Sequence, residues 1–301
     1  MIKLNIGLVL QPYTGNTGSQ ELSIGPELLS KELQKILKQQ KIENVTGRTI
    51  GLTSKQKKEY GVWNRMGLAN RHLSSAVSGL VQQKKIILGL LGNCNSLSGM
   101  LAGLQNSGKT KKPISVGLVW MDAHGDFNTP ETTLSGWLGG MPVAVAAGKC
   151  LHRLRKQAGL DPPISTQNII MLGLRDLDPL EQQLINDSSI TAFSTKQILK
   201  DNQRIMESLI QLSNQVKMIY IHIDLDILDA EYIPGHHFEV SEGLSPKRLS
   251  EIIRMMVKFE KVKALGIASF PTTDSGRKQS MDSTIQLFKS AIQGLRERKK
   301  T

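Results

Sequence analysis

The sequence is poor in cysteine and aromatic residues and lacks a long apolar run. Only two cysteines, Cys94 and Cys150, occur in 301 residues, and aromatic residues make up 4% of the chain. So few cysteines exclude a disulfide scaffold and favour the reducing cytoplasm. Residues 1–10 resemble a first strand more than a targeting segment. Because no apolar stretch approaches the ~20 residues of a membrane span, we expect no membrane contact.

Acidic residues are also in the minority. The formal net charge is +12, with 38 basic and 26 acidic residues. Such a charge is typical of proteins that bind nucleic acid, but these lysines are dispersed, without interleaved aromatic residues or a nucleic-acid motif. We therefore expect no nucleic-acid partner. The overall field would not attract a cationic substrate, so its capture would depend on local carboxylates.

Apolar runs of strand length alternate with helix-like stretches along the chain. The predicted strands are residues 4–10, 85–91, 116–121, 168–174, 218–223 and 262–268. The predicted helices are residues 26–39, 65–83, 195–212, 245–260 and 281–298. Strands that are apolar throughout indicate a parallel sheet covered on both faces. The sequence therefore predicts an α/β fold of three αβα layers with a mainly parallel central sheet, as a single domain over residues 1–301.

The residues after the third predicted strand are the most informative in the chain. Asp122, His124 and Asp126 alternate with Ala123 and Gly125 directly after an apolar run. In an extended backbone successive side chains alternate faces, so the three polar side chains would point the same way. An aspartate at a strand end is also a common turn former or helix N-cap, so one such motif leaves both readings open.

A second apolar run ends in the same kind of motif much later in the chain. Asp224 and Asp226 follow residues 218–223 and lie two positions apart. Carboxylates with one imidazole form an oxygen-rich set that favours a hard or borderline divalent ion such as Mn²⁺. Bridging carboxylates can hold two ions about 3.5–4 Å apart, which activate a water between them. The two motifs together predict metal-dependent hydrolysis.

These motifs resemble those of a known family. Residues 122–136, Asp-Ala-His-Gly-Asp-Phe-Asn-Thr-Pro-Glu-Thr-Thr-Leu-Ser-Gly, closely resemble the central motif of arginases, within the ureohydrolase family of dinuclear manganese amidinohydrolases. Residues 223–229 are similar to the second metal motif of that family, and residues 13–26 to its first loop and helix entry. The resemblance implies an arginase-like fold, hydrolysis of a guanidino C–N bond, and a homo-oligomer, either a trimer or a hexamer.

The resemblance also implies which residues hold the metal. Asp122 and Asp224 would bridge the ions, His124 and Asp226 would complete one of them, and Asp126 would help to complete the other. His124 and Asp126 are the residues that we expect to be catalytic. The expected ligands of one or two Mn²⁺ ions are Cys94, Asp122, His124, Asp126, Asp224 and Asp226.

Three further residues match those that bind the amino-acid end of the substrate in arginases. Residues 173–179 are similar to the arginase segment that supplies a carboxylate to the α-amino group, and Asp178 occupies that position. Asn128 and Ser135 match the residues that hold the α-carboxylate. The resemblance thus implies a small guanidino amino acid as substrate, and it disfavours decarboxylated guanidines such as agmatine.

The chain departs from the arginase pattern at a metal-ligand position. Arginases carry Gly-Asp-His-Ser where this chain reads Gly-Asn-Cys-Asn-Ser over residues 92–96. Either Cys94 or Asn95 therefore replaces a ligand histidine, and we favour Cys94. A soft thiolate suits Mn²⁺ poorly, so we expect one tightly held ion and one weakly held or different ion. The alternative for Cys94 is a buried structural thiol.

Two other departures concern the reacting end of the substrate. Gly139 stands where arginases have a histidine thought to shuttle protons, and either Ala268 or Ser269 stands where a glutamate grips the guanidinium. General acid–base help contributes roughly 10²–10⁴-fold, so its loss predicts a slower enzyme or a different leaving group. His236 or His237, in the loop after the second metal motif, is a candidate substitute for the missing histidine.

Ureohydrolases that act on N-hydroxylated arginine carry a cysteine at the position that Cys94 resembles. Hydroxyguanidine is far less basic than guanidine, so a missing counter-charge costs less binding energy with such a substrate. The sequence predicts an amidinohydrolase that releases urea or hydroxyurea from arginine or an arginine-like amino acid. The alternatives are a metal- and ligand-binding relative with little turnover, and a ureohydrolase for another substrate such as formiminoglutamate.

Overall fold

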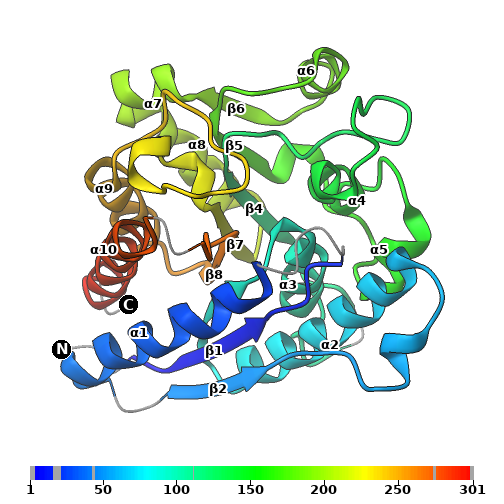
Figure 1. Cartoon of the computed structure of the whole chain (residues 1–301), viewed down its shortest axis with the longest axis horizontal. Coiled ribbons are helices and arrows are strands. Elements are labelled where there is room, and N and C mark those ends of the chain that lie inside the picture. The colour runs from blue at the N-terminus through cyan, green and yellow to red at the C-terminus, as the bar shows by residue number, and fades with distance from the viewer. Residues whose placement is uncertain (1–3, 16–21, 43–44, 111, 274–275, 299–301) are drawn as a thin grey trace.

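The strands form a parallel sheet at the centre of the molecule (Figure 1). The computed structural model describes residues 4–15, 22–42, 45–110, 112–273 and 276–298. Within these ranges the strands pair in the order β2-β1-β3-β8-β7-β4-β5-β6, and every pairing is parallel. They are β1 (Ile6–Gln11), β2 (Val45–Thr49), β3 (Ile86–Leu91), β4 (Val116–Met121), β5 (Ile169–Leu174), β6 (Thr191–Ser194), β7 (Met218–Asp224) and β8 (Val262–Ala268).

Helices follow most strands and carry the chain back to the start of the next one. The α-helices of the described ranges are α1 (Gly25–Gln39), α2 (Val62–Gln82), α3 (Leu97–Gln105), α4 (Pro142–Ala146), α5 (His152–Ala158), α6 (Pro179–Asn186), α7 (Thr195–Lys200), α8 (Asn202–Gln215), α9 (Pro246–Met256) and α10 (Arg277–Arg296). None of these helices combines the length and the apolarity that crossing a membrane requires.

Both faces of the sheet are covered by helices. Along β4, Val119 and Met121 join a core cluster with residues of α1, α8, α9 and α10, whereas Leu118 and Trp120 join a second cluster with residues of α2, α3, α4 and α5. Because both faces of each central strand are buried, the strands must be apolar throughout. The predicted three-layer αβα fold with a parallel central sheet is confirmed.

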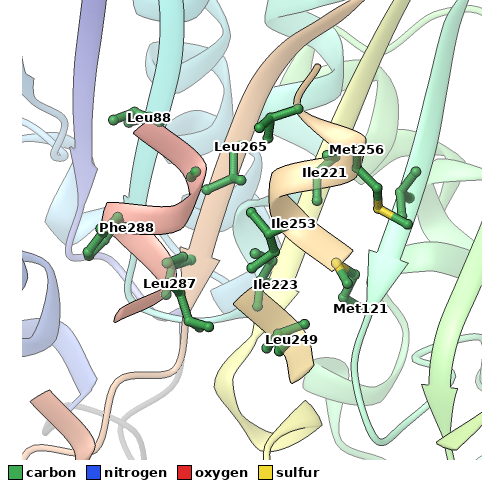
Figure 2. Packing of buried hydrophobic residues seen from close by; sticks show 14 of the residues in the cluster. Leu88, Met121, Ile221, Ile223, Leu249, Ile253, Met256, Leu265, Leu287 and Phe288 are labelled. Atoms are coloured by element: carbon green, nitrogen blue, oxygen red, sulfur yellow. The ribbon is translucent and has the colours of Figure 1, made fainter. Parts of the chain in front are cut away.

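Close packing fixes the central strands against the helices above them. Ile253 of α9 and Phe288 of α10 belong to one buried cluster with Ile221 of β7, Leu265 of β8 and Met121 of β4 (Figure 2). Each of these five side chains is at most 3% exposed. Burial of one such side chain contributes about 1.5–3 kcal/mol, so this layer holds the strand ends in a fixed relative position.

The two edge strands were not predicted from the sequence. Residues of β2 are half-buried or exposed, and its sequence Val-Thr-Gly-Arg-Thr contains no apolar run. Strand β6 is only 4 residues long, and Phe193 is its single buried residue. Pairing with β1 and β5 forms these strands, because their own side-chain pattern carries almost no signal.

The single helix predicted over residues 195–212 is wrong, since the chain forms two helices there. Asp201 separates α7 from α8 with an extended backbone, φ −147° and ψ 103°. Its side chain accepts hydrogen bonds from the backbone N–H groups of Gln203 and Arg204, at 2.8 and 3.3 Å. An aspartate that caps a helix start satisfies backbone donors that a continuous helix would use internally.

Candidate active site

Polar side chains gather at the carboxyl ends of β3, β8, β7, β4 and β5, which are consecutive in the sheet. Parallel sheets of this kind place their ligands at that edge. The side chains surround a pocket of about 190 Å³. The described residues that line it are Leu22, Asn93, Cys94, Asp122, His124, Asp126, Asn128, Ser135, Trp137, Gly139, Gly140, Asp176, Asp178, Glu181, Asp224, Asp226, His236, His237, Phe238 and Ser269.

One group of possible metal ligands joins the ends of β4 and β7. Single ligand atoms of Asp122, His124 and Asp226 all lie within 4.8 Å of one another. Nδ1 of His124 is 3.0 Å from Oδ2 of Asp226 and 3.3 Å from Oδ1 of Asp122. The second oxygen of Asp226 accepts a hydrogen bond from the backbone N–H of Ala123, at 3.0 Å. The backbone thus fixes the carboxylates that face the imidazole.

A second group shares Asp122 with the first and adds the end of β3. Ligand atoms of Cys94, Asp122 and Asp224 also lie within 4.8 Å of one another. Sγ of Cys94 donates to Oδ2 of Asp224 at 2.8 Å and lies 3.7 Å from Oδ2 of Asp122. Asn95, the alternative for the missing histidine, instead donates to the backbone carbonyl of Thr14, at 3.4 Å. The structure therefore brings Cys94 to the carboxylates.

The extended backbone that we expected for residues 122–126 is wrong. Strand β4 ends at Met121, and the backbone N–H of His124 turns back to donate to Oδ1 of Asp122 at 2.7 Å. Asp126 has a left-handed backbone with φ 46°, and it lines the pocket without belonging to either ligand group. Tight turns, and not strand alternation, aim these side chains at one another. Aspartate favours such turns because its carboxylate accepts nearby backbone N–H groups.

The acidic side chains of the pocket oppose one another's ionisation, because they are buried close together. Burial raises the pKa of Asp122 well above its usual value, and the neighbouring Asp226 adds to this effect. Burial also raises the pKa of Asp126. No lysine or arginine is among the described residues that line the pocket. A divalent cation would offset this repulsion, so the donor set fits a metal ion.

The two ionisable groups at the centre of the clusters have pKa values set by their neighbours. Burial alone would lower the pKa of His124, but contacts with Asp122 and Asp226 outweigh it and raise the value to about 12. Burial alone would raise the pKa of Asp224, but His236, Cys94 and Ser269 lie against this carboxylate and lower its pKa below the usual range. In the metal-free protein the protonated His124 ring therefore supplies the positive charge that a metal ion would supply beside the carboxylates.

Cys94 also contacts a buried polar chain that runs away from the pocket. Its Sγ lies 3.3 Å from Nε2 of His222, and Nδ1 of His222 lies 2.8 Å from the hydroxyl of Tyr220. Trp120 stacks on the His222 ring, with centroids 4.4 Å apart. Burial lowers the pKa of His222 to about 4, so this ring is neutral. His222 thus lies behind Cys94, on the side away from the pocket.

The expected substrate-binding residues lie together on one wall of the pocket. Nδ2 of Asn128 donates to Oδ2 of Asp178 at 3.0 Å, and the Asn128 carbonyl oxygen accepts from the hydroxyl of Thr132 at 2.9 Å. Ser135 is exposed, and its Oγ accepts from the backbone N–H of Trp137 at 3.2 Å. An amide, a carboxylate and a hydroxyl are thereby presented at one side of the pocket.

The structure accounts for the two departures from the arginase pattern at the reacting end of the substrate, at position 139 and at position 268 or 269. A Cβ atom at Gly139 would overlap the indole ring of Trp137, so glycine leaves this aromatic side chain room at the pocket wall. Of the two candidates at the glutamate position, Ala268 is buried in the core, whereas Ser269 lines the pocket. The Ser269 hydroxyl donates to Oδ2 of Asp224 at 2.5 Å. Neither departure places a charged side chain at the pocket.

Two groups in the pocket, Glu181 and Phe238, were not predicted from the sequence. Glu181 accepts a hydrogen bond from the backbone N–H of Phe127 at 2.7 Å, and burial raises its pKa to about 7. The ring of Phe238 lies 4.9 Å from that of Trp137 and edge-on to His124 at 6.1 Å. Glu181 lies three residues beyond Asp178, at the first turn of α6, and this spacing was the available signal. No local pattern marks Phe238, because its role arises from a distant contact.

Comparisons with known proteins agree with these observations. The model of the family described as "Arginase family" matches residues 4–292. The arginase of Bacillus caldovelox is 31% identical over 192 residues, which are 63% of this chain and 62% of that protein. The chain thus spans about 62% of the length of this curated relative.

Solved structures share the fold. The structure of Entamoeba histolytica arginase in complex with L-ornithine matches with a TM-score of 0.84 at 24% identity, covering 97% of this chain and 99% of that chain. Formimidoylglutamase from Bacillus subtilis matches with a TM-score of 0.75 at 16% identity, covering 99% of this chain and 89% of that chain.

Proposed function

Since the chain belongs to the arginase family, we propose that it is a metal-dependent amidinohydrolase that cleaves the guanidino or N-hydroxyguanidino C–N bond of an arginine-like amino acid. The products would be urea or hydroxyurea. The observation that carries this proposal is the pair of ligand groups that share Asp122 in the pocket. The cytoplasmic location, the absence of a nucleic-acid partner and the homo-oligomer stay predictions.

The donor set supports one or two Mn²⁺ ions as the cofactor. Nδ1 of His124 is the ligand atom on the imidazole, because it faces both Asp122 and Asp226 while Nε2 faces Asp176 at 3.5 Å. When bound, such ions lower the pKa of a water towards neutrality and polarise the substrate. Burial raises the pKa of the Cys94 thiol, and Asp224 and Asp122 raise it further, so Cys94 would release a proton as it binds metal.

His124 and Asp126 are the residues that we propose for catalysis. His124 would hold, through Nδ1, a metal ion that activates the water, between the carboxylates of Asp122 and Asp226. Asp126 is a buried carboxylate on the same pocket wall, and burial raises its pKa, which suits it to hold a proton during the reaction. The carbonyl oxygen of Asp126 accepts from the backbone N–H of Val143 at 2.9 Å, and this bond fixes the start of the loop that follows β4.

The polar wall of the pocket supports an amino-acid substrate. An α-ammonium group would donate to Asp178, and an α-carboxylate would accept from the Asn128 amide and the Ser135 hydroxyl. Because Asn128 and Asp178 already contact each other at 3.0 Å, their relative position is set before substrate binds. Such preorganisation reduces the entropy lost on binding. Agmatine lacks the carboxylate and would leave part of this wall unpaired.

The reacting end of the pocket supports a planar head group of low basicity. Ser269 presents a hydroxyl where the arginase resemblance implies a carboxylate, and Trp137 and Phe238 present aromatic faces. A planar guanidine or hydroxyguanidine can stack on such faces. The loss of a counter-charge costs less with hydroxyguanidine, because this group is far less basic than guanidine. N-hydroxyarginine is therefore the substrate that this end of the pocket favours.

The proposal is tested by product release from protein loaded with Mn²⁺. Arginine, N-hydroxyarginine, agmatine and formiminoglutamate are supplied separately, and urea, hydroxyurea and formamide are measured. We expect turnover of N-hydroxyarginine above that of arginine, and little turnover of agmatine. Asp178→Asn should raise KM at least about tenfold, whereas the exposed Asp187→Asn should leave KM unchanged. A clear preference for agmatine would contradict the assignment of this wall.

A binding protein with little turnover is the second candidate, and the absence of a charged side chain at positions 139 and 269 favours it. Arginine or N-hydroxyarginine would raise the unfolding temperature of such a protein. The protein would release neither urea nor hydroxyurea, whichever metal ion it is loaded with. Formamide release from formiminoglutamate alone would favour the third candidate. Product release and thermal unfolding together therefore separate all three functions.

A further inference from the structure

We propose that His236 is a metal ligand, and that its Nε2 supplies the imidazole that is missing where Cys94 stands. The proposal rests on the metal dependence proposed above. It concerns a residue in the loop between β7 and α9, outside both carboxylate motifs. The metal centre would then have two histidine ligands, His124 after β4 and His236 in the loop after β7.

The environment of the His236 ring is that of an unfilled ligand. The side chain is 1% exposed, and it lines the pocket. Its Nε2 has no hydrogen-bond partner among the described residues, although it lies 3.4 Å from Oδ1 of Asp224. A buried polar atom without a partner costs about 1–3 kcal/mol, so such an atom in a pocket of carboxylates needs an explanation.

The distances fit a shared ion. Two ligand atoms that each lie about 2.1 Å from one ion at a tetrahedral angle are about 3.4 Å apart. The other ring nitrogen, Nδ1, lies 3.2 Å from both the backbone carbonyl oxygen and the backbone nitrogen of Phe238. A metal-bound histidine commonly donates its second N–H to a backbone carbonyl. In the proposed centre Nδ1 would donate to the Phe238 carbonyl, and the Nε2 lone pair would be directed into the pocket.

The loop that carries His236 is tied to the strand end that carries Asp224 and Asp226. The guanidinium of Arg175 donates to the backbone carbonyls of Asp226, Val240 and Ser241, at 2.5, 2.9 and 2.9 Å. These bonds connect the two ends of the loop, before and after His236. The hydrogen bonds of the Arg175 side chain therefore help to hold the loop, and with it the His236 ring, beside Asp224.

The expanded donor set changes the ion that this position selects. With Cys94, Asp122, Asp224 and His236, the ligands are a thiolate, two carboxylates and an imidazole. Such a mixed set favours borderline ions such as Zn²⁺ or Co²⁺ over Mn²⁺. The position with Asp122, His124 and Asp226 has no thiolate ligand and suits Mn²⁺ better. We therefore expect the two positions to differ in metal preference.

Proton NMR of the Co²⁺-loaded protein tests the proposal, because a histidine bound to Co²⁺ shows a strongly shifted, exchangeable ring N–H signal. The wild-type protein should show two such signals, from His124 and His236, which both vanish in D₂O. His236→Gln should lose one signal and retain Co²⁺ at least about tenfold more weakly. His237→Gln is the matched control, since this neighbour is exposed, and it should keep both signals.

The result that overturns the proposal is a single shifted signal in the wild-type protein, or two signals that persist in His236→Gln. Either result would make His236 a hydrogen-bonding neighbour of Asp224. Circular dichroism of the metal-free variants checks that they fold. The outcome is independent of turnover, because urea or hydroxyurea release with only one histidine signal would leave the proposed function intact and remove this inference alone.

Discussion

The Cys94 thiol is surrounded by groups that oppose its ionisation. Burial and the neighbouring Asp224 and Asp122 raise its pKa, while Nε2 of His222 lies 3.3 Å behind the sulfur. A divalent cation in the same pocket would reverse the balance, because a coordinating thiol loses its proton. Uptake of metal should therefore release protons, and it should become tighter as the pH rises.

Cys94→Ser should remove one soft ligand while keeping a polar side chain of similar size. We expect the thiolate-to-metal absorption of the Co²⁺ protein to disappear, and Co²⁺ affinity to fall at least about tenfold. Cys150→Ser is the control, because Cys150 is buried away from the ligand groups. Co²⁺ titration followed by absorbance measures both effects. An unchanged absorption band in Cys94→Ser would show that the thiol does not bind metal.

Ionisation of Glu181 should make the metal-free protein less stable to unfolding as the pH rises. Burial raises the pKa of Glu181 from its ordinary 4.5 to about 7. A carboxyl group with a raised pKa contributes its full stability below pH ~4.5, and this contribution is lost as the pH rises through about 7. Glu181→Gln cannot ionise and keeps an oxygen that accepts from Phe127, so its stability relative to wild type should grow with pH, by up to about 3 kcal/mol.

Urea unfolding between pH 4.5 and 8 in the presence of a chelator measures this difference. Glu207→Gln, at an exposed position on α8, is the control and should show little change with pH. A constant difference between Glu181→Gln and wild type across this range would contradict the account of Glu181.

At single positions, the sequence predicted the residues that follow a strong local pattern. The two aspartate motifs stand out because each follows an apolar run, and the structure brings their side chains together. His236 was named only as a candidate, and Phe238 was missed. Their places in the pocket depend on a loop that Arg175 holds, and no spacing along the chain encodes that contact.

Whether a helix forms depends on close packing against its neighbours as well as on the apolar pattern of its sequence. Helix α3 is buried along its entire length and lies against α2. Two small residues permit this approach, since a Cβ at Gly103 would overlap Val77 and a Cβ at Gly99 would lie 2.7 Å from Oδ1 of Asn70. Helix α3 was not predicted from the sequence, because a short helix without a polar face has no amphipathic period.

Gly103→Ala should therefore destabilise the protein by about 1–3 kcal/mol, the usual cost of overpacking a core. Gly79→Ala, on α2, is the matched control. A Cβ there meets nothing within 4 Å, so alanine should stabilise the helix by about 0.5–1 kcal/mol. Chemical denaturation of the two variants and the wild-type protein gives both values. Equal effects of the two substitutions would contradict the described packing of α2 against α3.

In the whole molecule, strands that are far apart in the sequence become neighbours in the sheet. Strand β8 lies between β3 and β7, so the ends of β3, β8, β7 and β4 meet in one row. The apolar runs predicted a parallel sheet, but they did not encode this order, which long-range packing decides. The same order concentrates carboxylates in one pocket of a chain with a net charge of +12.

Metal uptake by the purified protein tests the central claim most directly. After dialysis against Mn²⁺, elemental analysis of the wild-type protein should find at least one bound ion per chain, and thermal unfolding should shift upwards on loading. Asp122→Asn, which weakens both ligand groups, should lose the ion and the shift, whereas Asp187→Asn should keep them. Wild-type protein that retains no divalent ion, or an Asp122→Asn variant that retains as many as wild type, would contradict the account.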